Sequence, residues 1–353
     1  MERPLYFDAV STAPVFSPRT HSSPHGDEAD RPLQSLRESV LREALQGLDV
    51  APGTQKSLPP WLFYDERGSA LFEQITRLPE YYLTRTERSI LAENADKILG
   101  SAGRPLTIAE LGSGTASKTG LLLAAAARRQ PGVLYQPIDV SRSALHHAAA
   151  ALPAAIPGVR VEPQVANYIT DGYRIHRPQD CCILALYIGS SIGNFGPAKA
   201  KSILRKLRSH LVNIGDALLL GVDLAPDGSK SVDRLLAAYD DAAGVTAAFN
   251  KNILAHLNRE LGADFDLDRF AHRARWNPAE SRIEMHLESL VDQTVHIDGH
   301  SIAFAAGETI HTENSYKFTE RALRALLNSA GFSVPQLFED PQRYFAVALS
   351  YPA

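Results

Sequence analysis

Cysteine is scarce in this chain, and long apolar runs are missing. The 353 residues include two cysteines, which are neighbours at Cys181 and Cys182. Neighbouring cysteines rarely pair, so we expect no disulfide framework and a reducing, cytoplasmic location. No apolar run reaches the length of about 18 residues that a bilayer span needs. The N-terminal segment also lacks the apolar core of a secretory signal, so we expect neither a membrane partner nor export.

An excess of either charge is also missing. The 36 basic and 40 acidic residues leave a formal net charge of −4. Nucleic-acid-binding domains usually carry a strong basic excess, so we expect no nucleic-acid partner. The 12 histidines form no H-E-x-x-H or comparable cluster, so we expect no metal. These features favour a monomer that binds a small molecule.

The length and the changing rhythm of the sequence favour two domains. Residues 1–34 are rich in proline, serine, arginine and histidine, which predicts a flexible tail. An apolar stripe preceded by the capping pair Ser35 and Glu38 predicts a helix over residues 35–47.

Between residues 86 and 228, apolar strands alternate with helices, which is typical of an α/β fold with a doubly wound parallel sheet. The predicted strands are 106–112, 134–139, 159–165, 181–189 and 217–223. After residue 228 the pattern changes to two helical segments and then to strands with period two, with a turn at Asp298-Gly299. A final strand, RYFAVAL, fits either sheet.

A glycine turn follows the first strand. Glu110-Leu111-Gly112-Ser113-Gly114 lies between a predicted strand and a predicted helix, where glycines let the backbone approach a ligand closely. The third glycine of a dinucleotide fingerprint is replaced by Ser117, and Lys118 lacks the glycine spacing of a phosphate-binding loop. The turn therefore resembles the S-adenosylmethionine type, and a plain strand-to-helix turn is the alternative.

Polar residues also end the following strands. Asp139 closes the second strand, where a carboxylate can hold both ribose hydroxyls, or alternatively cap a helix in competition with Ser141. Asn167 follows the third strand and can contact adenine or simply form a turn. After the fourth strand, the small residues of IGSSIGNF leave room for a substrate, and the Asn194 amide can bind an amino-acid carboxylate or amine or can belong to a turn.

Longer motifs resemble the ergothioneine-pathway L-histidine Nα-methyltransferases. The resemblance begins near Lys56 and continues to the C-terminus. Its blocks are KSLPPWLFYDERGSALFEQITRLPEYYLTRTE, ELGSGTASKT, IGSSIGNF, AYDDAAGVTAAFNKNIL, NRELGADFDLDRF, RIEMHL and ENSYKF. It implies a class I Rossmann-like methyltransferase domain over residues 86–228. It also implies a second, α+β substrate-binding domain interleaved around the first and built from residues 35–85 and 229–353.

The resemblance further implies trimethylation of the α-amine of L-histidine to hercynine, with S-adenosylmethionine as donor and S-adenosylhomocysteine as product. The implied substrate pocket contains Tyr64, Tyr81, Gly189, Asn194, Tyr239, Met285, Glu313 and Ser315. Asn194 and Tyr239 would hold the carboxylate, and Tyr64 and Tyr81 would flank the amine as catalytic residues. Glu313 and Ser315 would bind the imidazole, and Met285 would pack on the ring. We assign cofactor binding to Glu110, Gly112, Ser113, Gly114, Lys118, Asp139 and Asn167.

Elementary chemistry agrees with this set. Glu313 and Ser315 lie two residues apart on a predicted strand, so they share a face and can meet both nitrogens of an imidazole. Taken singly, Glu313 fits a solvated strand residue, and Met285 fits an ordinary core residue. The family's glycine-aspartate pair after the third strand is Ala166-Asn167 here, which lacks the adenine-binding charge.

Two other hypotheses remain. A related methyltransferase could act on another amino acid or small amine, although such a pocket would not need the carboxylate of Glu313. A nucleoside-binding module without catalysis would not need to retain the substrate residues.

Overall fold

The computed structural model describes the backbone of residues 27–353 and the side chains of residues 37–353. Its larger sheet has eight strands in the order β13-β14-β7-β6-β2-β3-β4, with β5 also paired to β3. These strands are β2 (Leu106–Leu111), β3 (Val133–Asp139), β4 (Val159–Val161), β5 (Gln164–Val165), β6 (Cys182–Tyr187), β7 (Ala217–Asp223), β13 (Phe332–Glu339) and β14 (Phe345–Pro352).

The predicted parallel strands are confirmed. β2, β3, β4, β6 and β7 pair in parallel, and every residue of β2, β3 and β7 is buried. Burial on both faces explains why these strands read as continuous apolar runs. The single strand predicted over 159–165 is divided into β4 and β5, because Pro163 between them has no backbone N–H to donate to a ladder.

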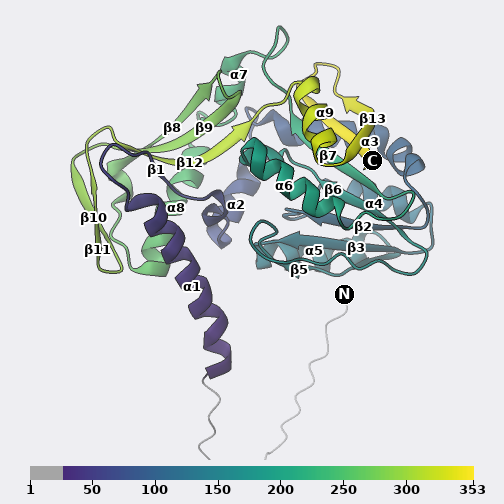
Figure 1. The fold of residues 1–353 in the computed structure, drawn as a ribbon, viewed down its shortest axis with the longest axis horizontal. Coiled ribbons are helices and arrows are strands. Elements are labelled where there is room, and N and C mark those ends of the chain that lie inside the picture. Colours follow the sequence, from purple (N-terminus) through teal and green to yellow (C-terminus); the bar gives the residue numbers. More distant parts are fainter. Residues whose placement is uncertain (1–26) are drawn as a thin grey trace, which may run out of the picture.

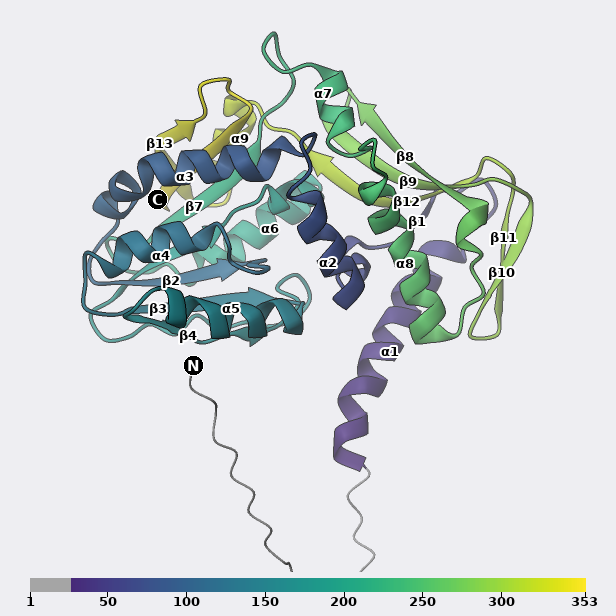
Figure 2. The ribbon, with the colours of Figure 1, turned by 180° about the vertical axis from the view of Figure 1, so that it is seen from behind.

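Helices cover both faces of this sheet, as Figures 1 and 2 show. α3 (Tyr82–Ser101), α4 (Thr119–Ala127) and α5 (Arg142–Ala155) lie on one face. α6 (Pro197–Arg208) and α9 (Glu320–Ser329) lie on the other. The result is the doubly wound α/β arrangement that the alternating pattern predicted.

The C-terminal boundary predicted for the substrate-binding domain is wrong. β14 pairs antiparallel with β7, placing Val347 opposite Gly221, and β13 pairs with β14. The end of the 229–353 segment therefore completes the large sheet. The sequence left RYFAVAL undecided because an apolar run predicts a buried strand without naming its partner.

The predicted N-terminal tail is also too long. Helix α1 (Asp27–Leu48) begins well before Ser35, so residues 27–34 are helical and the Ser35-Glu38 pair lies inside the helix. Residues 1–26 of the predicted tail lie outside the described residues.

A second body lies beside the large sheet (Figure 1). Its sheet has the order β1-β12-β9-β8 and is accompanied by the β10-β11 hairpin. The strands are β1 (Lys56–Ser57), β8 (Phe270–Asn277), β9 (Arg282–Ser289), β10 (Gln293–Ile297), β11 (His300–Phe304) and β12 (Thr309–Tyr316). The helices are α1, η1 (Pro60–Phe63), α2 (Glu66–Ile75), α7 (Val232–Ala237), α8 (Val245–Leu261) and η3 (Leu267–Arg269).

The hairpin turn confirms its prediction. Asp298 and Gly299 both have positive φ, at 47° and 85°, as the two central residues of a tight hairpin turn require. Elsewhere in this body, aromatic packing joins η1 to α8, because the Phe63 and Phe249 rings stack with their centroids 4.6 Å apart.

The two bodies meet where β12 passes the loop after β6. This loop contains η2 (Ser191–Asn194), and a Cβ on Gly193 would lie 2.8 Å from the Tyr316 carbonyl oxygen. Glycine is therefore required for the close approach of β12. Just beyond β12, the Phe318 amide donates to the Asp223 carbonyl at the end of β7, at 3.0 Å. The end of β12 is thereby held against the carboxyl ends of the parallel strands.

Over the described part of the chain, no helix combines the length and the apolar character that crossing a bilayer requires.

Replacing a buried residue of β14 tests the position of the C-terminal strand. We expect Phe345→Ala to lower the free energy of unfolding by about 3–5 kcal/mol, because its ring is fully buried. Val212→Ala, at a residue that is 70% exposed, serves as the control and should change it by less than about 0.5 kcal/mol. Urea denaturation measures both, and similar small effects would contradict the placement of β14 in the core.

Candidate active site

Two adjoining cavities lie at the carboxyl ends of the parallel strands. The outer cavity has a volume of about 610 Å³, which accommodates a nucleoside-sized ligand, and the inner pocket is much smaller. The residues that line both are Tyr64, Phe72, Ser191 and Asn194. A ligand in the outer cavity can therefore reach a ligand in the inner pocket past these side chains.

The outer cavity contains the glycine turn and the acidic strand end. Gly112 and Gly114 line it with φ of 66° and 51°, a conformation that favours glycine. Asp139 also lines it, and its carboxylate accepts from the amides of Gly114 and Ser141, each at 2.8 Å. Burial raises the pKa of Asp139, whereas these amides oppose the shift.

These residues fit a nucleoside cofactor. A Cβ on Gly112 would point toward Tyr168, 3.6 Å from its hydroxyl, and would narrow the cavity that both residues line. Asn167 lines the same cavity, and its side-chain oxygen accepts from the Ile169 amide at 3.1 Å. Asn167 thus forms the turn considered as an alternative and leaves its NH₂ group available to a ligand.

Three of the predicted cofactor residues line neither cavity. Glu110 is buried behind the glycine turn, where it accepts from Thr119 at 2.7 Å and from Tyr135, and burial raises its pKa to about 7. Ser113 is also buried. Lys118 forms an ion pair with the fully buried Glu87. Glu110 therefore supports the turn from behind, whereas the Lys118 ammonium lies beside Gly189 of the loop after β6.

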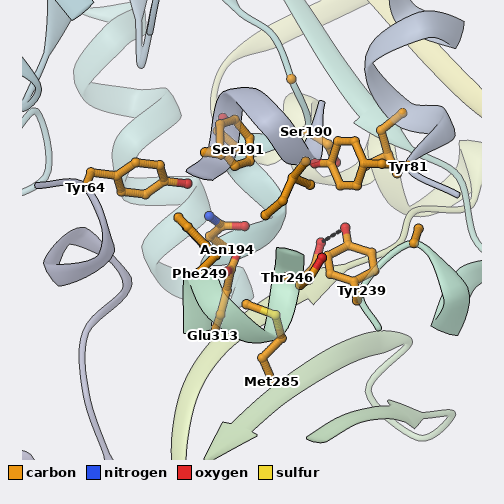
Figure 3. A pocket seen from close by; sticks show the side chains of 16 residues that line it. Tyr64, Tyr81, Ser190, Ser191, Asn194, Tyr239, Thr246, Phe249, Met285 and Glu313 are labelled. Carbon is orange, nitrogen blue, oxygen red and sulfur yellow. Dashed lines mark hydrogen bonds between the residues drawn. The ribbon is translucent and has the colours of Figure 1, made fainter. Parts of the chain in front are cut away.

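The inner pocket brings together all eight predicted substrate residues (Figure 3). They come from both bodies: Tyr64, Tyr81, Tyr239, Met285, Glu313 and Ser315 face Gly189 and Asn194 of the loop after β6. Met285 and Glu313 are cross-strand partners on β9 and β12. A register shift between His311 and Glu313 precedes them, and such bulges re-aim side chains.

The pocket tyrosines are neutral hydroxyl groups. Burial is the main cause that raises the pKa of Tyr64 and of Tyr81 well above the ordinary value, and the charge of Glu313 adds to it. Both phenols therefore keep their protons at neutral pH. They can donate hydrogen bonds and pass a proton along, but they cannot act as phenolate bases.

Glu313 is the charged side chain of the inner pocket. Burial raises its pKa to about 7, while the positive charge of Lys317 opposes this shift. The carboxyl group therefore changes its charge in the physiological range. It lies opposite the apolar Met285, a combination that suits a ring with both a flat face and polar edges.

A buried ionic network behind the pocket was missed by the sequence analysis. The Asp223 carboxylate at the end of β7 binds the ammonium groups of Lys230 and Lys317, each at 2.8 Å, and all three side chains are fully buried. The Tyr82 hydroxyl donates to Asp223 at 2.9 Å. Lysine is usually exposed, so nothing in the sequence pattern marked these lysines as buried.

Several apolar and small wall residues were also missed. They are Phe72, Ile75, Leu83, Ser190, Ser191, Ala238, Thr246 and Phe249. Phe72 lies on α2 and Phe249 on α8. Both rings pack edge-on against Tyr64 and tilted against each other, with all three pairs of ring centroids within 6 Å. Their helical spacing is that of ordinary core residues. Only their position in the folded chain, close to the loop that contains η2, shows that they line the inner pocket.

A doubly wound sheet with this acidic strand end and with a glycine turn that lacks the third glycine of a dinucleotide fingerprint is typical of class I S-adenosylmethionine-dependent methyltransferases. Comparison with known families then specifies the family. A sequence model described as "Histidine-specific methyltransferase, SAM-dependent" matches residues 40–352, and the chain belongs to this family.

Individual relatives agree with the family assignment. The chain is 44% identical to a histidine N-alpha-methyltransferase of Mycolicibacterium smegmatis, over 90% of this chain and 96% of that protein. It is 42% identical to a histidine N-alpha-methyltransferase of Mycobacterium tuberculosis, over 88% and 94% of the two chains. A more distant relative is N-methyltransferase fsqC of Aspergillus fumigatus, at 28% identity over 87% and 82%.

Removing the Asp139 carboxylate tests its contact with the cofactor. We expect Asp139→Ala to weaken binding of S-adenosylhomocysteine by about 10- to 100-fold, because a charge-assisted hydrogen bond to the ribose is lost. Titration calorimetry measures this affinity. Asp96→Ala, which removes a carboxylate that is 70% exposed on α3, is the control. Unchanged affinity in Asp139→Ala would rule out the ribose contact.

Proposed function

We propose that this enzyme methylates the α-amine of L-histidine and carries the reaction to the trimethylated betaine, hercynine, the first step of ergothioneine biosynthesis. The observation that carries the proposal is the Glu313–Met285 pair in a pocket that opens onto the cofactor cavity. The names of the two mycobacterial relatives support the same substrate.

The pocket offers a group for each part of histidine. We assign the imidazole to Glu313 and Ser315, with Met285 against the ring, and the carboxylate to Asn194 and Tyr239. In this arrangement the α-amine lies near Tyr64. Tyr64 lines both cavities, so the amine faces the place where the methyl donor would be held.

Methyl transfer requires a neutral amine aligned with the methyl group. S-adenosylmethionine supplies an activated methyl group when it is held by Gly112, Gly114, Asp139 and Asn167. The protein's part is to orient the amine between Tyr64 and Tyr81 and to let its proton leave. Because both phenols are neutral, we propose that their hydroxyls relay this proton to water instead of removing it as bases.

Repeated methylation requires a pocket that tolerates a growing cation. The amine end is surrounded by aromatic rings, since Phe72 lies 5.8 Å from Tyr64 and 6.3 Å from Tyr81 between ring centroids. Ring faces attract alkylated ammonium groups through their quadrupoles. These contacts support a reaction that continues to the trimethyl product.

The alternative function is methylation of another amino acid or small amine. Its support is the relative from Aspergillus fumigatus, whose name states an N-methyltransferase without a substrate. Glu313 favours histidine over this alternative, because a buried carboxylate is costly unless the ligand offers a donor or a positive charge.

Product analysis tests the proposed function directly. We expect histidine incubated with the enzyme and S-adenosylmethionine to gain one, two and then three methyl groups, all on the α-nitrogen, as read by mass spectrometry with fragmentation. The same assay should be run with the other common amino acids and with histamine. Methylation of another compound in preference to histidine would exclude the proposed substrate.

The pH dependence tests the role of Glu313. Because the pKa of Glu313 is about 7, the carboxyl group is half ionised near pH 7, is mostly charged at pH 8 and loses its charge as the pH falls. We expect Glu313→Gln to lower kcat/KM for histidine by about 10- to 100-fold at pH 8. The ratio of wild type to variant should shrink as the pH falls through 7, while the deprotonation of the substrate amine affects both proteins equally.

Glu284→Gln is the matched control for this experiment. Glu284 lies on the neighbouring strand β9, is paired with Arg282 at 2.7 Å and has a pKa of about 2. It does not line the inner pocket, so its replacement should leave the pH dependence unchanged. A ratio of wild type to Glu313→Gln that stays constant from acidic to basic pH would contradict the role of the Glu313 charge.

A further inference from the structure

The inner pocket has no positive charge in its wall. Among its lining residues, all within the part of the chain whose side chains are described, there is no lysine or arginine. The charged residue there is Glu313, which is an acid. An amino-acid substrate brings a carboxylate, and burying an anion without a nearby cation is costly. The balancing charge must therefore lie behind the wall, where the Lys118 ammonium, beside Gly189, is already paired with the buried Glu87.

Lys317 lies immediately behind this wall. Its ammonium nitrogen is 2.7 Å from the Tyr239 hydroxyl oxygen, 2.9 Å from the Ser315 hydroxyl oxygen and 2.8 Å from the Asp223 carboxylate. The three contacts match the three donors of an ammonium group. Burial lowers the pKa of Lys317 and Asp223 raises it, and an environment made of three acceptors favours the charged form.

Asp223 forms ion pairs with two ammonium groups, and the charges of Glu313 and Asp340 also act on Lys317 and Lys230, respectively. Asp223 is shared by Lys317 and Lys230, and the two lysines hold the pKa of Asp223 below its ordinary value against the effect of burial. Of the two, Lys317 contacts hydroxyls of the pocket wall, whereas Lys230 contacts the Tyr82 hydroxyl and the Tyr344 carbonyl.

Lys317 determines in which direction the hydroxyls of Tyr239 and Ser315 can donate. The hydroxyl oxygens of Tyr239 and Ser315 lie 2.8 Å apart, so one hydroxyl donates to the other. Both accept from Lys317, which has no acceptor of its own. Only one hydroxyl proton of the pair is then left to donate into the pocket. If Tyr239 donates it to a carboxylate, Ser315 donates to Tyr239 and presents a lone pair to an N–H of the ligand.

We propose that Lys317 is a positioning residue for the substrate carboxylate. Its ammonium acts through the Tyr239 hydroxyl to balance the carboxylate charge, and it sets Ser315 as an acceptor. The inference rests on the proposed function only in requiring an α-amino acid as substrate. Glu313 then faces the imidazole and Lys317 lies behind the carboxylate, so the two charges orient the ligand in the pocket.

A pair of lysine variants tests the proposal. Lys317→Met and Lys230→Met each remove one ammonium from Asp223, but only the first changes the pocket wall. Affinities for L-histidine and for L-histidinamide, whose amide is uncharged, are measured by calorimetry with S-adenosylhomocysteine present. We expect wild type to prefer histidine by about tenfold or more. Lys317→Met should lose this preference, Lys230→Met should keep most of it, and Lys317→Arg should restore part of it.

Three outcomes would overturn the proposal: equal loss of preference in Lys317→Met and Lys230→Met, full preference in Lys317→Met, and no preference in wild type. Equal binding of histidine and histidinamide by wild type overturns the proposal even if Lys317→Met fails to fold, because it means that no positive charge acts on the carboxylate.

Failure of the proposed function gives a different result. If wild type methylates another amino acid, that amino acid and its amide replace histidine and histidinamide, and the variant comparison stands. If the substrate proves to be an amine without a carboxylate, both proposals are excluded. If wild type methylates histidine while the amide preference does not depend on Lys317, only the positioning role is excluded.

Discussion

The arrangement of the two bodies depends on one buried ion cluster. Asp223 ends the last parallel strand, β7, and binds Lys230 in the segment that follows β7. It also binds Lys317 just beyond β12 and Tyr82 at the start of α3. Because a buried carboxylate without its partners would be strongly destabilising, the cluster specifies one relative position for these segments. That position brings Glu313 and Ser315 on β12 to the loop after β6.

The site consists of two adjoining parts, the outer cavity and the inner pocket. The large sheet supplies the glycine turn and Asp139 to the outer cavity, while the second body supplies most of the inner pocket. Tyr64, Phe72, Ser191 and Asn194 form the wall between the spaces. Alignment of two ligands across a shared wall is what a group-transfer reaction requires, since the reacting atoms must meet in one geometry.

Local sequence patterns predicted the large sheet and the glycine turn, but they did not predict most residues of the inner pocket. The strands and the turn at Gly112 and Gly114 have strong local signals, because apolar runs and glycines act within a few residues. Glu313, Met285 and Tyr64 have no such signal, and their joint assignment came from the family resemblance. Lys317 was missed because its charge suggests exposure, and β14 was left without a partner because an apolar run does not identify its neighbour.

By itself, the sequence determined the parallel strands, the turn at Asp298 and Gly299, and the position of the carboxylate at Asp139. These features follow from local backbone preferences and from the periodicity of burial. Only the tertiary structure decided that β14 lies between β7 and β13 in the large sheet and that the register of β12 shifts just before Glu313. It also decided that two lysines share Asp223 behind the pocket, because pairing and desolvation depend on atoms that lie far apart in the chain.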